Sequence, residues 1–171
     1  MPKWIEGTIR FRGSKENIKK FVTEGLELPG RIVKGDKKTE INYEEDGYIE
    51  ICISYASNEK DSKNEYPRKM YIPHTRRNFV EGDMGDICIH KNKNRDDFTL
   101  VLEFQGAWSI DTDGLTAAAK EYEIDIRVNG YERGMEFEQL FEVNRHGSVR
   151  CDSVIQYEDY EWECPMPLLG G

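Results

Sequence analysis

Long hydrophobic runs are absent from this sequence of 171 residues. A membrane-spanning helix needs about 20 consecutive apolar residues, and no stretch approaches that length. The first residues also lack the apolar segment of a secretory signal peptide. We therefore expect a cytoplasmic protein that does not enter a membrane.

The sequence also lacks the short motifs that mark many catalytic and metal sites. It contains no glycine-rich nucleotide-binding loop, and no serine stands in a nucleophile elbow. The four cysteines are far apart and form no C-x-x-C pair, which argues against a zinc ribbon and against dithiol redox chemistry. Cys88 and His90 form a C-x-H pair, but no second pair of ligands accompanies it. We expect reduced thiols, no bound metal and no cofactor.

Histidine is scarce, with three residues in the chain. His146 precedes Gly147 in a predicted turn, where polar residues are common. His74 lies close to Arg76 and Arg77, and an imidazole beside two cations could act on a phosphodiester. No second histidine stands at a spacing that would complete an acid–base pair. His74, Arg76 and Arg77 are therefore the catalytic candidates, although the sequence as a whole favours a protein without enzymatic activity.

The sequence does contain a repeated alternation of apolar and polar residues, which is typical of half-buried strands. The alternation starts at residues 3–12, and a helix follows that Ser14 caps and Gly25 ends. Further expected elements are a hairpin of 31–34 with 38–43, a turn at 45–47, and strands at 48–55 and 86–91. Residues 70–85 show no regular pattern.

The clearest pattern extends from Phe98 to Tyr157. Its expected elements are a strand at 98–104, a helix over 115–122 capped by Asp111 or Thr112, and strands at 123–128, 135–143 and 149–157. Asn129-Gly130 is expected to form a turn. The aromatic residues expected in the core are Phe104, Trp108, Phe137 and Phe141.

From these elements we predict one compact α+β domain with a ferredoxin-like antiparallel sheet, two helices on one face and an inserted β-hairpin region. Its expected parts are an N-terminal β-α-hairpin part (1–56), a loop-rich insertion (57–97), a ferredoxin-like β-α-β-β core (98–157) and an acidic tail whose last residues fray (158–171).

The net charge of −9 is unevenly distributed along the chain. Residues 1–38 contain ten Lys or Arg and five Asp or Glu, whereas residues 101–171 contain five and fifteen. The basic candidates for contacts with nucleic-acid phosphates are Arg10, Arg12, Lys15, Lys19, Lys20, Lys34, Lys37 and Lys38. The candidates for an acidic face that docks on a basic groove, or binds a divalent ion, are Glu123, Asp125, Glu136, Glu138 and Glu142. A solvated charged surface is the alternative for both sets.

Several residues between 108 and 147 carry a resemblance to a known family. They are Trp108 before a helix, Tyr122 near the end of that helix, the run Tyr131-Glu132-Arg133-Gly134-Met135-Glu136-Phe137, and Gly147 in a hairpin. With these features the segment resembles the C-terminal ferredoxin-like domain of the YubB-like proteins, which phages, prophages and conjugative elements carry. The family's short N-terminal strand and helix are similar to the segment with Trp4 and Gly13-Ser14 here, whereas residues 28–97 have no counterpart.

The resemblance implies an accessory protein of a mobile genetic element, for which the family supplies no catalytic residues. Together with the charge pattern it leads to the hypothesis of a counter-defence inhibitor in the cytoplasm of a host bacterium. The expected partner is a host nucleoprotein effector, with Cas9 and its guide RNA as the leading example, which would make the protein an anti-CRISPR. The alternatives are a nuclease or a protein that provokes RNA cleavage, centred on His74, Arg76 and Arg77, and a module that binds a small ligand.

Overall fold

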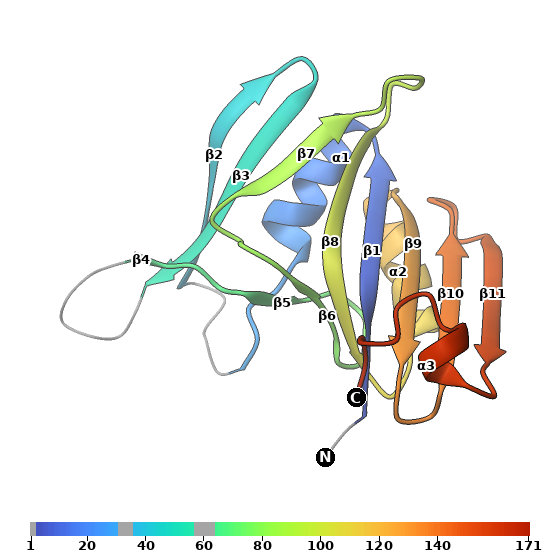
Figure 1. The fold of residues 1–171 in the computed structure, drawn as a ribbon. Helices are drawn as coiled ribbons and strands as arrows, with labels where there is room; N and C mark the ends of the chain where they lie inside the picture. Colours follow the sequence, from blue (N-terminus) through green and yellow to red (C-terminus); the bar gives the residue numbers. More distant parts are fainter. Residues whose placement is uncertain (1–2, 31–35, 57–63) are drawn as a thin grey trace.

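The computed structural model describes residues 3–30, 36–56 and 64–171, which form an α+β protein built on one large antiparallel sheet (Figure 1). The strands are β1 Trp4–Gly13, β2 Lys37–Glu45, β3 Tyr48–Ala56, β4 Asn64–Glu65, β5 Lys69–Tyr71, β6 Asn78–Glu81, β7 Ile87–Lys91, β8 Phe98–Ala107, β9 Asp125–Glu132, β10 Phe137–Val143 and β11 Val149–Gln156. The helices are α1 Lys15–Lys20, which continues as the π-helical turn η1 Phe21–Gly25, α2 Thr112–Tyr122 and the short α3 Tyr160–Glu163. The predicted α+β class with an antiparallel sheet is confirmed.

The strand order places the N-terminal strand in the middle of the sheet. The order is β11-β10-β9-β1-β8-β7-β3-β2, and β1 pairs along its whole length with β8 and over residues 6–12 with β9. The other edge of β8 is shared by two short strands, β7 beside Phe98 and β6 beside Gln105. β11 forms an edge strand, where Val154 and Ile155 are 60% and 49% exposed.

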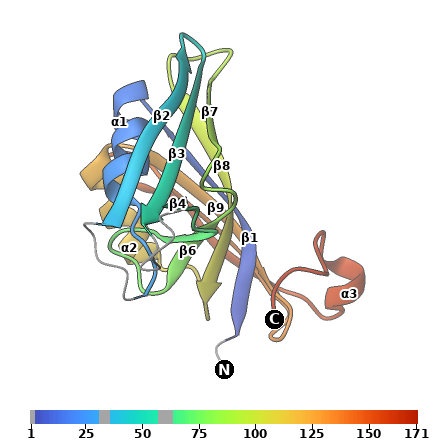
Figure 2. The same cartoon turned by 90° about the vertical axis from the view of Figure 1, so that its left-hand side faces the viewer.

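The helices α1 and α2 lie on one face of the sheet, and α3 lies on the other side (Figure 2). Alternate residues of β1 explain this arrangement, because neighbouring side chains of a strand point to opposite faces. Ile5, Ile9 and Phe11 point toward α1 and α2 and are fully buried. Arg10 and Arg12 point away from the helices, to the side that we call the open face.

The helices α1 and α2 begin at the residues that the sequence predicts. The Ser14 hydroxyl accepts a hydrogen bond from the Asn17 amide (3.2 Å), and the Asp111 carboxylate accepts one from the Gly114 amide (3.0 Å). These bonds satisfy amides that have no partner inside the helix. The predicted end of the first helix at Gly25 is confirmed as well.

The C-terminal segment packs on the end of the open face where β1 begins. Tyr160 is 2% exposed and forms a small cluster with Tyr131 and Cys164. The Gly170 amide donates to the Glu6 carboxylate (3.1 Å), and the Gly171 amide donates to the Trp4 carbonyl (3.0 Å). The expectation that the last residues fray is therefore wrong, and only the opposite end of the open face is left uncovered by this segment.

The predicted turn at Asn129-Gly130 is wrong, because β9 continues to Glu132. A Cβ atom on Gly130 would lie 2.7 Å from the Ile5 side chain, so glycine serves close strand packing here. The turn comes later, and Met135, which we placed at the start of a strand, lies in it and is 55% exposed.

Trp108 was expected in the core, but its side chain is 57% exposed. Residues 70–85 were expected to be irregular, yet they contain β6 and the end of β5, with Met70 and Val80 completely buried. Strands of three or four residues are too short for an alternating pattern to be recognised. The hairpin partner 31–34 lies outside the described residues, and β2 pairs with β3 across the predicted turn at 45–47.

Candidate functional site

The uncovered end of the open face carries a group of arginines that we call the arginine face. It is formed by Arg10 and Arg12 of β1, Arg127 of β9, Arg95 before β8, Arg145 after β10 and Arg150 of β11. Arg10 lies opposite Arg127, and Arg12 lies opposite Asp125, in the antiparallel pair of β1 and β9. Residues directly opposite each other share a face of the sheet, so the strand register brings these side chains together.

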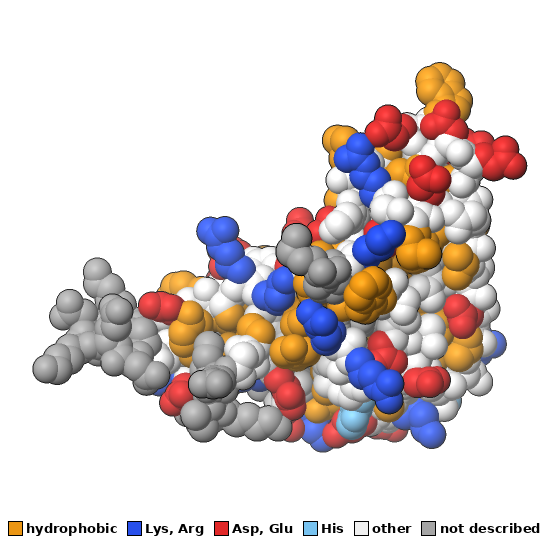
Figure 3. Space-filling view, turned by 90° about the horizontal axis from the view of Figure 1, so that it is seen from below, with side chains coloured by type: hydrophobic (Ala, Val, Ile, Leu, Met, Phe, Trp, Pro, Cys, Tyr) orange, Lys and Arg blue, Asp and Glu red, His pale blue; other side chains and the backbone are white. Residues whose placement is uncertain are grey.

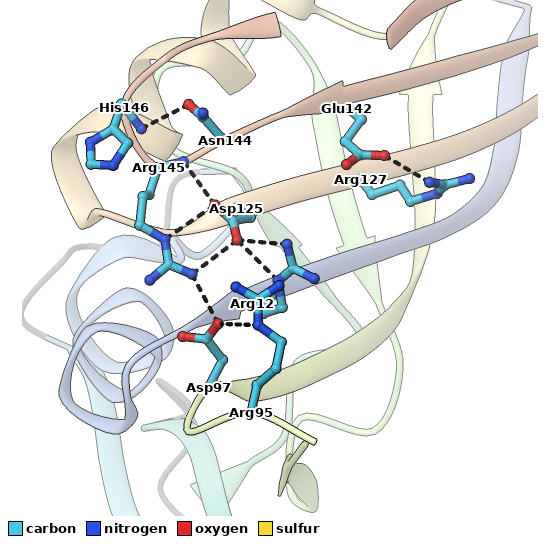
Figure 4. A network of polar contacts seen from close by, with 9 residues as sticks. All are labelled: Arg12, Arg95, Asp97, Asp125, Arg127, Glu142, Asn144, Arg145 and His146. Atoms are coloured by element: carbon cyan, nitrogen blue, oxygen red, sulfur yellow. Dashed lines mark hydrogen bonds and ion pairs between the residues drawn. The ribbon is translucent and has the colours of Figure 1, made fainter. Parts of the chain in front are cut away.

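Asp125 holds two of the arginines in place (Figure 4). Its carboxylate accepts hydrogen bonds from Arg12 Nε at 3.0 Å, from Arg145 Nε at 3.2 Å and from the Arg145 amide at 2.9 Å. Asp97 adds a second carboxylate, which lies 3.3 Å from both Arg145 Nη2 and Arg95 Nε. The guanidinium groups are therefore fixed in position rather than free to rotate.

The charge of Asp125 is stabilised by these contacts. Partial burial by itself raises the pKa of Asp125, but the hydrogen bonds from Arg145 and Arg12 outweigh it and lower the pKa to about 2. The pKa of Arg145 is raised in turn, mainly by its hydrogen bond to Asp125. Both groups stay ionised at any physiological pH.

Two other arginines of the face have no partner of their own. The guanidinium groups of Arg10 and Arg150 are exposed and make no hydrogen bond or ion pair with any residue that the structure describes. Arg127, in contrast, lies 2.7 Å from the Glu142 carboxylate. A shallow hollow of about 330 Å³ lies between Arg12, Arg145 and Arg150. The face can therefore offer unpaired guanidinium groups beside a preformed hollow to an anion.

The predicted basic residues are divided between the two faces of the sheet. Of the predicted basic residues that the structure describes, only Arg10 and Arg12 belong to the arginine face. Lys15 and Lys19 of α1 pair with Glu44 of β2 at 2.5 and 3.2 Å. The remaining positions are Lys20, exposed on α1, Lys37 of β2, whose ammonium donates to the Leu26 carbonyl, Lys38, exposed on β2, and Lys34, which lies outside the described residues.

The predicted acidic residues do not form one continuous plate. Asp125 and Glu142 lie within the arginine face and are paired with arginines. Glu138 accepts a hydrogen bond from the Tyr157 hydroxyl (2.7 Å). Glu123 ends α2 and Glu136 lies in the turn before β10, both exposed and with φ of 51° and 59°.

No contact joins the side chains of the three catalytic candidates, all of which the structure describes. The His74 imidazole contacts the Glu121 carboxylate at the surface, where the two side chains are 46% and 49% exposed. The Arg77 guanidinium lies 5.6 Å from the centre of the Trp4 ring, and the Arg76 side chain is exposed. A solvated imidazole–carboxylate contact is an ordinary surface ion pair, so this arrangement gives no support to a catalytic centre.

Several residues of the arginine face could not be found from the sequence. Arg95, Arg145 and Arg150 come from separate turns and strand ends. The pairing of β8 with β1 and of β1 with β9 brings Arg95 to the face, and the pairing of β9, β10 and β11 brings Arg145 and Arg150. Arg127 did have a signal, because it alternates with Ile126 and Val128 in a predicted strand and so had to share a face with Asp125.

Comparison with protein-family models, with curated proteins and with solved structures finds no match to this chain. Within the described ranges, no helix is long and apolar enough to cross a membrane. The same ranges contain no group of His, Cys, Asp or Glu side chains arranged to hold a metal ion, and the four cysteines are free thiols.

Proposed function

We propose that this protein is a non-enzymatic binding protein whose arginine face contacts the phosphates of a nucleic acid within a nucleoprotein. The observation that carries the proposal is the pair of unpartnered guanidinium groups, Arg10 and Arg150, beside arginines that Asp125 fixes in position. A guanidinium group matches the geometry of a phosphate and can bind two of its oxygens at once.

The net charge of the protein does not attract a nucleic acid at long range, so binding depends on short-range contacts. A net charge of −9 repels a polyanion at long range, so affinity has to come from direct contacts at the arginine face. The same charge would favour approach to a nucleoprotein whose protein component is basic. A complex of protein and nucleic acid therefore suits this molecule better than free nucleic acid.

The strand order supports the finer fold assignment that we propose, a ferredoxin-like core. β1, β7, β8 and β9 lie in the order β9-β1-β8-β7, with α1 after β1 and α2 between β8 and β9. With β2–β6 inserted between α1 and β7, this order is compatible with a β-α-β-β-α-β core, which β10 and β11 would extend at one edge and β3 and β2 at the other. Such a fold leaves one sheet face open for binding, but it does not choose the ligand.

The narrower form of the proposal is a counter-defence protein of a phage or prophage that acts in the bacterial cytoplasm. It is supported by the resemblance of residues 108–147 to YubB-like proteins. A CRISPR effector such as Cas9 with its guide RNA is the nucleoprotein that we would test first.

The first test compares two double variants that remove the same charge from different faces. Arg10→Ala with Arg150→Ala changes the arginine face, and Lys20→Ala with Lys38→Ala changes exposed cations elsewhere. Binding to a fluorescein-labelled RNA duplex, measured by anisotropy, should weaken about tenfold in the first variant and stay unchanged in the second. Equal losses in both variants, or no loss in either, would contradict a role for the arginine face.

A second measurement addresses the nucleoprotein. The same proteins are immobilised and incubated with purified Cas9 loaded with guide RNA, and with Cas9 alone. Retention of the loaded complex by the wild type, and its loss from the arginine variant, supports the narrower proposal. Equal retention of Cas9 with and without RNA would show that the phosphates are not what this face recognises.

A further inference from the structure

Aromatic and basic side chains also gather at the opposite end of the sheet, where β1 begins and β8 ends. We call this group the aromatic end, and it consists of Trp4, Trp108, Lys3, Lys69, Arg76 and Arg77. On this side of the molecule, Lys and Arg side chains surround exposed hydrophobic ones (Figure 3). The sequence did not indicate the group, because its members come from three distant segments.

Trp108 is held outward by its backbone. The residue has a φ of 74°, its amide donates to the Lys3 carbonyl (2.8 Å), and its side chain is 57% exposed. His74 and Arg77 on the neighbouring loop also have positive φ values, 66° and 56°. Such conformations are costly for bulky residues and persist only where the surroundings enforce them, often at binding sites.

A buried polar network enforces this geometry. The Asn78 side chain is completely buried, donates to the Ser109 carbonyl (3.3 Å) and accepts from the Asp111 amide (2.8 Å). Asp111 also accepts a hydrogen bond from the Arg76 amide (2.6 Å). The loop before β6 and the loop after β8 are thus joined, and the site is formed before any ligand arrives.

The two tryptophans differ in what they can still bind. The Trp4 ring is already covered by cations, with Lys69 Nζ at 5.3 Å and the Arg77 guanidinium at 5.6 Å from its centre. The Trp108 ring has no aromatic or cationic neighbour among the residues that the structure describes. Arg76 lies on the loop whose backbone amide binds Asp111, shortly after Trp108 in the chain, and its exposed guanidinium has no partner among the described residues. A free indole surface and a free guanidinium therefore remain available.

We propose that the aromatic end binds an unpaired nucleobase, stacked on Trp108, while Arg76 contacts a neighbouring phosphate. Flat aromatic surfaces surrounded by cations are how proteins hold single strands without sequence preference. This inference rests on the proposed function and specifies the form of nucleic acid, a strand with unpaired bases.

The test uses a fluorescein-labelled oligouridine and an RNA duplex of the same length as probes. Trp108→Ala should weaken oligouridine binding about tenfold and leave duplex binding unchanged, because a duplex offers no free base face. Trp162→Ala is the matched control, since Trp162 is 87% exposed but lies between Glu161 and Glu163. Trp108→Gly is the second variant, because glycine accepts a φ of 74° without strain and so preserves the fold.

The outcomes separate this inference from the proposed function. If both Trp108 variants bind oligouridine as the wild type does, or if the wild type binds only the duplex, stacking at the aromatic end is overturned and the arginine face is unaffected. If the wild type binds neither probe, both proposals fall. Loss of oligouridine binding in both Trp108 variants, with the Trp162 variant unchanged, supports the stacking site.

Discussion

Asp125 is the residue on which the arginine face depends. Its carboxylate collects hydrogen bonds from Arg12 and Arg145, which would otherwise repel each other and turn toward solvent. A carboxylate that holds two arginines lowers the net charge of the face but fixes their direction. Side chains fixed in this way lose less conformational entropy when they bind a phosphate.

The lowered pKa of Asp125 leads to a prediction about acid stability. The pKa of Asp125 in the folded protein is about 2, below the ordinary 3.8. The stability that its ionised carboxylate contributes is therefore complete above pH of about 4 and is lost as the pH falls toward 2. Asp125→Asn should therefore lower the free energy of unfolding by about 2 kcal/mol at neutral pH, and the difference should shrink below pH of about 4. Urea unfolding at several pH values measures it.

Asp152→Asn is the matched control for this experiment. The Asp152 side chain is exposed on β11 and its carboxylate has no partner among the described residues. This control should unfold like the wild type at every pH. A pH-independent effect of the Asp125 change would mean that the ion pairs contribute nothing to stability.

Among the larger elements, the C-terminal segment decides how much of the open face is accessible. Tyr160 anchors it, because its ring packs on Tyr131 and its hydroxyl donates to the Leu169 carbonyl (3.1 Å). The segment thereby covers the open face near Trp4 and Glu6 and leaves the arginine face uncovered. The buried Tyr160 ring, rather than a long helix, fixes the position of this segment.

Tyr160→Ala should release this segment without unfolding the sheet. Removal of a buried aromatic ring costs about 3 kcal/mol, so exchange of the Gly170 and Gly171 amides, which donate to Glu6 and Trp4, should accelerate about 100-fold. Hydrogen–deuterium exchange measures this effect. Trp162→Ala, an exposed change on the same helix, should leave both amides protected, and equal exchange in the two variants would show that Tyr160 is no anchor.

Elements with a long, regular pattern could be predicted from the sequence. The alternation in β1 and the caps Ser14 and Asp111 depend on neighbouring residues alone, so they can be recognised locally. The position of Trp108 could not, because the amides of Ala107 and Trp108 donate to the carbonyls of Arg77 and Lys3, which are distant in sequence. Contacts between residues distant in sequence determine such positions. The arginine face is assembled in the same way.

On the scale of the whole molecule, the arginine face is a small positive region on a protein of net charge −9. Its free cations, Arg10 and Arg150, allow about two phosphate contacts. The logarithm of the duplex binding constant should then fall against the logarithm of salt concentration with a slope of about −2. Titrations between about 50 and about 200 mM salt measure the slope, and the Arg10→Ala and Arg150→Ala double variant should bring it close to zero. A slope that stays the same in this variant would place the phosphate contacts elsewhere.

The central position of β1 has a consequence for synthesis of the protein on the ribosome. Thr8 lies opposite Glu103 of β8 on one side and Asn129 of β9 on the other, so β1 is synthesised long before either of its neighbouring strands. Until those strands follow, Ile5, Ile9 and Phe11 remain exposed to solvent. Pairing between such distant segments makes folding slow. During this time the apolar side of β1 is a binding site for the chaperones at the ribosomal exit tunnel.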